Sequence, residues 1–119
     1  IEFLGNLPQS KIRELLNRSK LLIHTSEYET FGLVAIEAHS VGVPVVSINQ
    51  GSFKEIIDNN INGYIGESFE DQNLNEFILK IFSDDKYAEY VSKSAINNAK
   101  KYDWESTSKE LLNLYKSLI

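Results

Sequence analysis

Hydrophobic residues follow two patterns along this chain, and the two patterns alternate. Mainly apolar runs without strict alternation, at residues 21–24 and 43–48, are typical of strands that are covered on both faces of a sheet. Helical periodicity is found at residues 9–18, before the first run, and at residues 33–41, between the two runs. A short helical segment is also expected at residues 53–58, after the second run. Strand–helix–strand spacing of this kind predicts a parallel α/β sheet.

Further signals extend this plan at both ends of the chain. Residues 1–4 form an apolar run that predicts a strand, and residues 64–66 follow an Asn-Gly turn and predict a short last strand. Helical segments are expected at residues 74–82, at 85–101 and from Trp104 onward. The first and the last carry apolar stripes that are expected in the core, whereas residues 85–101 are less clearly amphipathic. The stripe of the first consists of Leu74, Phe77, Ile78, Ile81 and Phe82, and that of the last of Leu111, Leu114, Tyr115 and Leu118.

Two glutamates flank the start of the helix expected at residues 33–41. On a helical wheel, Glu37 falls between Leu33 and Val41, inside the apolar stripe, whereas His39 points the opposite way, to the helix surface. A carboxylate on a packing face must find a partner or carry a heavy desolvation cost. That partner is either a ligand or a set of backbone amides through which Glu37 pins a loop.

The second glutamate, Glu29, lies in the loop just before this helix. Thr30 is expected to cap the helix, which leaves the N–H groups of residues 31–33 without intrahelical partners and ready to bind an anion. Gly32 has no side chain to keep a ligand away from the backbone. Ligands of open parallel sheets bind beyond the carboxyl ends of the strands, where this loop lies. A phosphate on the amides, a hydroxyl on Glu29 and a diol on Glu37 together describe a nucleotide sugar.

The sequence around these glutamates resembles a known family. Residues 29–46 read E-T-F-G-L-V-A-I-E-A-H-S-V-G-V-P-V-V, which resembles the E-x7-E signature of retaining GT-B glycosyltransferases, family 4 type (glycosyl transferases group 1). Residues 50–57 (Q-G-S-F-K-E-I-I) and 62–65 (N-G-Y-I) are similar to that family's G-G-x-x-E-I-I and N-G-x-L-V pieces. The similarity extends to residues 102–105 and 114–115 and so covers nearly the whole chain. Gln50 and Lys54 depart from the usual glycine and proline of this pattern.

The resemblance implies a role for each matching residue. Glu29 would hold a hydroxyl of the donor sugar as the catalytic-site carboxylate, and Glu37 would accept hydrogen bonds from the ribose hydroxyls. The amides of Phe31, Gly32 and Leu33 would bind sugar hydroxyls or diphosphate oxygens. The other candidate donor-binding residues are Ser26, Thr30, Gly5, Asn6, Leu7 and Gly51.

Four of these candidates, in two places along the chain, have a simpler interpretation. The loop of residues 5–8 is either a plain βα turn or, as in the resembling family, a neighbour of the nucleotide base. Ser26 either binds a phosphate or caps the turn after its strand, and the cap is the favoured interpretation.

The resemblance also implies what residues 1–119 do. It predicts a partial Rossmann-like three-layer α/β domain, the C-terminal half of a GT-B fold without its leading βα units, that binds a nucleotide-diphosphate sugar. The enzyme would transfer the sugar to a polysaccharide or glycolipid acceptor, and departure of the diphosphate would generate an oxocarbenium-like transition state that fixed dipoles stabilise. No metal and no cofactor other than the donor substrate is expected.

The resembling family also has parts that find no match in this sequence. These are a diphosphate-binding Arg and Lys on earlier βα units, and the N-terminal domain that binds the acceptor. The chain is therefore expected to be a fragment that is inactive by itself. An exposed sheet edge is expected to favour self-association.

Composition argues against several other classes of function. The chain has 119 residues, a net charge of −5 and no cysteine, which disfavours nucleic-acid binding, disulfides and thiolate metal sites. His24 and His39 lack metal-ligand spacing. Neither a membrane-spanning run nor a signal peptide is found in the sequence, so the expected location is the cytoplasm, at the inner membrane face in the full-length protein.

Two other classes remain as alternatives. A GT-B-fold epimerase would show acidic and histidine residues in a different loop pattern, and a phosphorylase would need a cofactor lysine that is not identifiable here. A non-enzymatic flavodoxin-like binding module would carry acidic residues at the strand ends. The strand ends carry His24, Thr25, Ser47 and Asn49 instead, which disfavours this reading.

Overall fold

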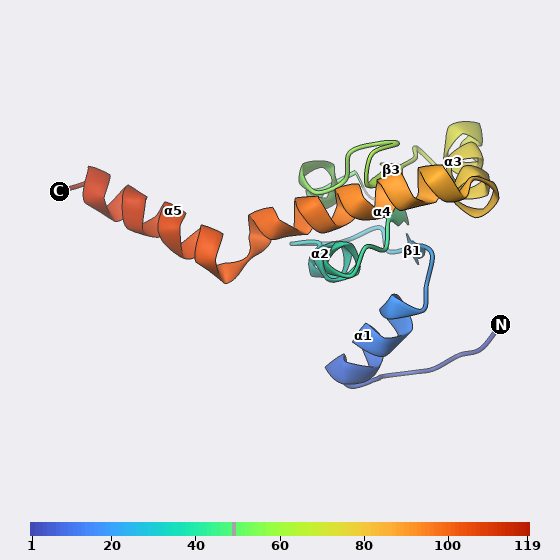
Figure 1. The fold of residues 1–119 in the computed structure, drawn as a ribbon, viewed down its shortest axis with the longest axis horizontal. Coiled ribbons are helices and arrows are strands. Elements are labelled where there is room, and N and C mark those ends of the chain that lie inside the picture. Colours follow the sequence, from blue (N-terminus) through green and yellow to red (C-terminus); the bar gives the residue numbers. More distant parts are fainter. Residues whose placement is uncertain (49) are drawn as a thin grey trace.

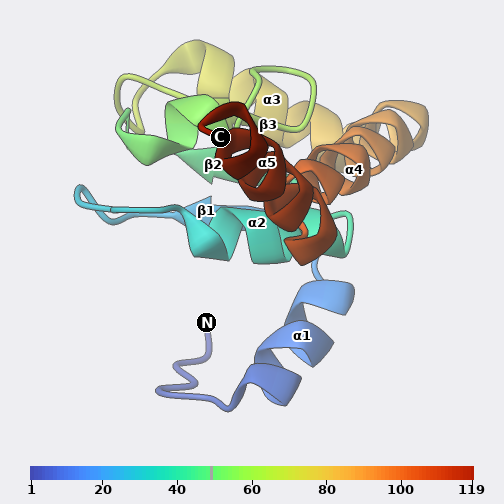
Figure 2. The same ribbon diagram turned by 90° about the vertical axis from the view of Figure 1, so that its left-hand side faces the viewer.

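The computed structural model describes residues 1–48 and 50–119. Its centre is a parallel three-stranded sheet in the order β1 (Leu22–His24), β2 (Val45–Ser47) and β3 (Gly63–Ile65). Ile23 lies opposite Val46 in the strand register. Figures 1 and 2 show α1 and α2 below the sheet and α3 above it. The expected parallel α/β fold is confirmed.

Helices connect and follow the strands close to where the sequence predicts them. Their bounds are α1 (Gln9–Asn17), α2 (Leu33–Ser40), the 3-10 helix η1 (Ser52–Glu55), α3 (Gln72–Ser83), α4 (Asp85–Ala99), the 3-10 helix η2 (Lys100–Tyr102) and α5 (Trp104–Ser117). The last three α-helices have aspartate N-caps, Asp71, Asp84 and Asp103. Their carboxylates accept hydrogen bonds from backbone amides of the first turn of each helix.

The core consists of two hydrophobic clusters, one on each face of the sheet. Consecutive residues of β2 point to opposite faces, so Val45 packs with the α2 and η1 side chains and Val46 with those of α3 and α4. The first cluster includes Ala35, Ala38 and Phe53, and the second Leu74, Phe77 and Val91. Burial of both faces explains the consecutive apolar residues Val45 and Val46 of β2 and confirms the three-layer arrangement.

The prediction of a strand at residues 1–4 is wrong. The segment carries no strand pairing, and its side chains are exposed, with Phe3 at 95 %. A strand needs a neighbour for its backbone hydrogen bonds, whatever its apolar content. The described residues offer this segment no such neighbour, and it leads directly into α1 (Figure 1).

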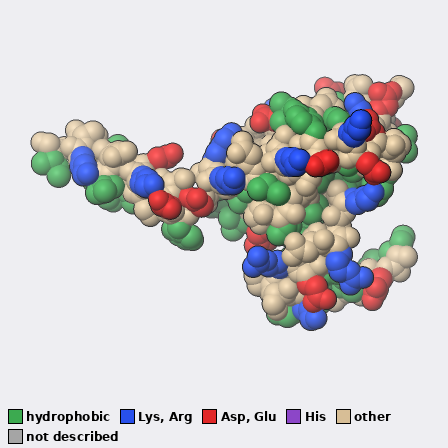
Figure 3. All heavy atoms as spheres, viewed as in Figure 1, with side chains coloured by type: hydrophobic (Ala, Val, Ile, Leu, Met, Phe, Trp, Pro, Cys, Tyr) green, Lys and Arg blue, Asp and Glu red, His purple; other side chains and the backbone are tan. Residues whose placement is uncertain are grey.

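The prediction that the stripe of the last helix lies in the core is also wrong. None of the residues of α5 is buried, and the exposure of its stripe reaches 74 % at Leu118. Figures 1 and 3 show α5 extending away from the rest of the domain, with hydrophobic side chains along it. The periodicity indicates an amphipathic helix correctly, but it does not say whether this chain supplies the surface that covers the stripe.

The helical-wheel prediction for α2 needs correction as well. His39 is fully buried, together with Ala35 and Ala38, whereas Leu33 is 63 % exposed. Glu37 is half-buried, at the border of the packed face. The helix is apolar on nearly all sides, so the wheel alone does not identify its buried face. The packed face is set by the sheet and by α4, which both contact α2.

The outer edge of β1 is open among the described residues, since β1 pairs only with β2. The outer edge of β3 is covered instead by Asn59, which bridges Gly63 and binds the backbone of Ile65. We predict concentration-dependent dimers through pairing of β1 edges, with Ile23 half exposed at that edge. Sedimentation velocity over a wide concentration range measures this, and Ile23→Lys is expected to shift the chain toward monomer. A wild-type chain that stays monomeric at the highest concentration contradicts the prediction.

Candidate functional site

The side chain of Glu29 organises the loop between β1 and α2. Its Oε1 accepts hydrogen bonds from the backbone N–H groups of Thr30, Phe31 and Gly32, at 3.0, 3.3 and 3.2 Å. Gly32 is the N-cap residue of α2 and has a left-handed backbone with φ of 72°. The expectation that Thr30 caps the helix is therefore wrong, because the Glu29 carboxylate binds the amides before the helix and Gly32 begins it.

These hydrogen bonds also keep Glu29 charged. The N–H of Gly32, followed by that of Phe31, holds the pKa of the Glu29 carboxyl below its ordinary value, and nearby His24 adds a smaller effect in the same direction. Hydrogen bonds to the charged form favour it. Glu29 is thus an anion that accepts hydrogen bonds and does not donate them at neutral pH.

Two of the backbone amides that were expected to bind a ligand bind the Glu29 carboxylate instead. The N–H groups of Phe31 and Gly32 point to Glu29 Oε1. The first hydrogen bond within α2 runs from the N–H of Ala35 to the carbonyl oxygen of Gly32. The N–H groups of Leu33 and Val34 come before it and therefore have no intrahelical partner. Within the described chain, these two amides are the donors that the helix start leaves for an anion.

Glu29 lines a hollow of about 440 Å³ beyond the carboxyl end of the sheet. The hollow brings two predicted site residues, Thr30 and Gly51, next to Glu29 from segments far apart in the sequence. Its lining is Glu27, Tyr28, Glu29, Thr30, Ile48, Gln50 and Gly51. Crevices at this edge of parallel sheets are where ligands of such folds bind.

The 3-10 helix η1 supports the loop from the side. Ser52 Oγ donates to the backbone oxygen of Glu29 at 3.4 Å, and the Phe53 ring packs edge-on against His24 with centroids 4.7 Å apart. A Cβ on Gly32 would lie 2.6 Å from Ile56 Cδ1 and 2.8 Å from the Phe53 ring, so this position accepts only glycine without rearrangement. The sequence did not reveal that Ser52 and Phe53 support the Glu29 loop, since only tertiary packing brings η1 to this loop.

Glu37 has a partner that the sequence did not reveal. Gln9, the first residue of α1, donates from Nε2 to Glu37 Oε1 at 2.8 Å. No backbone amide of residues 1–48 and 50–119 binds this carboxylate, which is half-buried where α2 faces α1. An amide side chain is an exchangeable partner, since a ligand hydroxyl offers the same donor to Oε1.

The remaining predicted residues lie on either side of these glutamates. Ser26 Oγ donates to the backbone oxygen of Tyr28 at 2.8 Å, which fits the turn-capping interpretation. Gly5 has a φ of 63°, and with Asn6 and Leu7 it forms the approach to α1, whose first residue contacts Glu37. Asn6 is exposed and Leu7 is half-buried.

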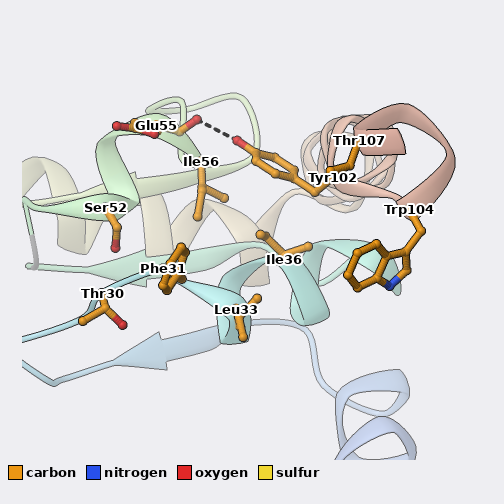
Figure 4. A pocket seen from close by; sticks show the side chains of 10 residues that line it. All are labelled: Thr30, Phe31, Leu33, Ile36, Ser52, Glu55, Ile56, Tyr102, Trp104 and Thr107. Carbon is orange, nitrogen blue, oxygen red and sulfur yellow. Dashed lines mark hydrogen bonds between the residues drawn. The ribbon is translucent and has the colours of Figure 1, made fainter. Parts of the chain in front are cut away.

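A larger and mainly apolar hollow of about 760 Å³ lies on the other side of Thr30. Figure 4 shows Phe31 and Leu33 from the start of α2 on one side of it, and Tyr102 and Trp104 from the η2–α5 junction on the other. Tyr102 Oη donates to the backbone oxygen of Glu55 at 3.0 Å, which ties this junction to η1.

The described residues show neither a metal-binding cluster nor a membrane-spanning helix. Within residues 1–48 and 50–119, acidic, histidine and cysteine side chains form no group of three that could hold a metal ion. Helices in the same ranges are too short or too polar to span a bilayer.

Comparison with known proteins identifies the family. The family model described as glycosyl transferases group 1 matches residues 1–101. The chain belongs to this family. Membership in this family agrees with the resemblance of residues 29–46. It does not favour the alternatives of a GT-B-fold epimerase, a phosphorylase or a flavodoxin-like binding module.

Individual relatives in this family come from different organisms. The chain is 32 % identical, over 98 % of its length, to an uncharacterized glycosyltransferase of Methanocaldococcus jannaschii. It is 30 % identical, over 99 % of its length, to the O-antigen chain mannosyltransferase B of Escherichia coli. Because the match covers 30 % of each relative, the chain spans less than a third of their length.

A solved structure is similar to this glycosyltransferase-family chain throughout most of its length. The Anabaena protein HepE, in complex with UDP, superposes with a TM-score of 0.78 and 26 % identity over 92 % of the chain, which is 30 % of HepE. HepE has also been solved in complex with UDP-glucose. The expected relation to GT-B glycosyltransferases is confirmed at the level of the fold.

Proposed function

We propose that this chain is the donor-binding part of a retaining glycosyltransferase that moves a sugar from a nucleotide-diphosphate sugar to a polysaccharide or glycolipid acceptor. The observation that carries the proposal is the Glu29 carboxylate, which three amides hold in its charged form beside a hollow at the carboxyl edge of the sheet. The HepE complexes with UDP and UDP-glucose support a nucleotide-sugar donor.

Each group has a role that follows from its position. Glu29 accepts a hydrogen bond from a hydroxyl of the donor sugar and so fixes the sugar ring. The Leu33 and Val34 amides, at the positive end of the α2 dipole, stabilise the negative charge that develops on the diphosphate as the glycosidic bond breaks. Glu37 exchanges its bond with Gln9 for bonds from the ribose hydroxyls.

The chain supplies only the donor-binding part of the active site. Cationic groups that neutralise the diphosphate and the surface that binds the acceptor belong to other parts of the enzyme, and this chain alone has no transferase activity. The donor itself is the only small molecule that the proposed mechanism uses, and no metal or cofactor takes part. Gly5, Asn6 and Leu7 approach the nucleotide base, and Gly51 closes the hollow beside Glu29.

Substitution of the two glutamates tests these assignments in protein made from the complete gene. Glu29→Gln is expected to lower the transfer rate about 100-fold while affinity for the nucleoside diphosphate is kept, because a misplaced sugar ring reacts poorly. Glu37→Gln is expected to weaken nucleoside diphosphate binding about tenfold, which is the loss of one hydrogen bond to a charged group. UDP-, GDP- and ADP-sugars are screened by calorimetry and by release of the nucleoside diphosphate.

The matched control is Glu110→Gln, which makes the same chemical change on the exposed surface of α5. It is expected to behave like the wild type in both assays. Unchanged turnover of Glu29→Gln contradicts the sugar-contact role, and unchanged nucleotide affinity of Glu37→Gln contradicts the ribose role.

A further inference from the structure

His24, the last residue of β1, stands next to the anchored carboxylate. Its Nε2 lies 3.7 Å from Glu29 Oε2, the oxygen that the three backbone amides do not bind. The side chains are 14 % and 25 % exposed, so the contact is largely shielded from water. Phe53 packs edge-on against the imidazole and holds it in place.

The two ring nitrogens of His24 have different surroundings. Nδ1 is buried and makes no hydrogen bond within the described residues, whereas Nε2 faces the carboxylate. A neutral imidazole carries one N–H and one lone pair. A proton on Nδ1 would be buried without an acceptor and would turn the Nε2 lone pair toward a negative charge. The arrangement therefore favours the tautomer with its N–H on Nε2, directed at Glu29.

We propose that His24 is a positioning residue, whose Nε2–H orients Oε2 of Glu29 for the hydroxyl of the donor sugar. The amides fix Oε1, and a second contact at Oε2 sets the plane of the carboxylate. This inference rests on the proposed function, since it takes Glu29 to be the group that meets the donor. It adds a residue that belongs to β1, so the rigid sheet determines where the carboxylate points.

Two variants separate orientation from packing. His24→Leu keeps an apolar side chain against Phe53 and removes the donor, whereas His24→Gln keeps an N–H donor of similar reach. In protein made from the complete gene, release of nucleoside diphosphate from UDP-glucose, GDP-glucose and ADP-glucose is measured. His24→Leu is expected to lower kcat about tenfold with KM unchanged, and His24→Gln is expected to recover most of the loss. Ile23→Val, at the next strand position and facing the other way, is the control and is expected to match the wild type.

The outcomes distinguish this inference from the proposed function. A normal kcat for His24→Leu together with a reduced kcat for Glu29→Gln overturns the role of His24 and leaves the function in place. Equal losses for His24→Leu and His24→Gln also overturn it, because they indicate packing alone. Normal turnover of Glu29→Gln overturns the proposed function itself.

A spectroscopic measurement on this chain does not depend on activity. Long-range ¹⁵N–¹H correlation spectra distinguish the two neutral tautomers of His24. The Nε2–H tautomer is expected in the wild type, with a shift of the Nε2 resonance in Glu29→Gln. An Nδ1–H tautomer in the wild type, or an Nε2 chemical shift that is the same in the wild type and in Glu29→Gln, overturns the inference.

Discussion

Acidification from pH 7 to pH 4 is expected to lower the free energy of unfolding of this chain by about 3 kcal/mol through His39 alone. Burial lowers the pKa of His39 from 6.5 to about 4, while the Asn62 backbone and the Asp58 carboxylate act weakly in the opposite direction. In the unfolded chain the same imidazole titrates near its ordinary value of about 6.5. A difference of roughly 2.5 pKa units corresponds to about 3 kcal/mol.

The direction of the effect follows from proton binding. Below pH 6.5 the unfolded chain binds a proton on His39 that the folded chain excludes, so each step down in pH favours unfolding. The contribution is fully present above pH 6.5, is lost as the pH falls toward 4, and changes no further once both states bind the proton.

The contacts of His39 explain why the folded state keeps it neutral. Asn98 Nδ2 lies 3.3 Å from His39 Nδ1 and also donates to the backbone oxygen of Ile56 at 2.8 Å. Asn98 is thus the donor and Nδ1 the acceptor, which places the imidazole proton on Nε2. That atom is buried without a hydrogen bond in the described residues, and a second ring proton would remove the acceptor that Asn98 uses.

Denaturant unfolding of the wild type and of His39→Leu at pH 7, 5.5 and 4 measures the effect. Carboxylates such as Glu29 and Asp103, whose pKa values backbone hydrogen bonds lower, also destabilise the fold in acid, but they do so equally in both proteins. The difference between the two proteins therefore isolates His39. Parallel pH dependences in the two proteins would contradict the buried neutral state.

Replacement of Gly63 by alanine is expected to cost about 3 kcal/mol of stability, at the upper end of the usual range for overpacking. A Cβ at this position would lie 2.2 Å from the backbone oxygen of Val45 and 3.0 Å from Ile57 Cγ2. Val45 is the residue that pairs with Gly63 in the sheet, so the added methyl group pushes β3 off β2. Backbone atoms of a buried strand cannot turn away as a side chain does.

Gly66→Ala is the matched control at the end of the same strand. Its Cβ would lie 2.6 Å from Leu74 Cδ1, the end of a flexible side chain, and 3.1 Å from the backbone oxygen of Ser68. We expect a smaller loss of stability, because Leu74 can change rotamer. Thermal and denaturant unfolding of both variants make the comparison, and equal stabilities of Gly63→Ala and Gly66→Ala would refute the steric explanation.

The Asn-Gly pair at residues 62–63 shows that a family motif can have a structural cause. The side chain of Asn62 is buried, accepts from the Asp58 amide at 2.8 Å and donates to the Ile56 carbonyl at 3.2 Å. Gly63 then allows β3 to approach β2 closely. Both residues shape the support of η1, which in turn contacts the Glu29 loop through Ser52.

The sequence by itself determined the parallel sheet and the order of elements from α1 onward, and it singled out Glu29 and Glu37 as candidates, because apolar runs and local loop chemistry are properties of neighbouring residues. Only the tertiary structure decided the partners of these groups. His24 and Gln9 reach the two carboxylates from β1 and α1, and His39 is buried by α4.

The errors have the same origin. Residues 1–4 have strand composition without a neighbouring strand, and α5 has an amphipathic stripe without a covering surface among the described residues. Local pattern states which face of a segment is apolar. Whether that face is buried depends on residues distant in sequence, and pairing or packing with them is what fixes it.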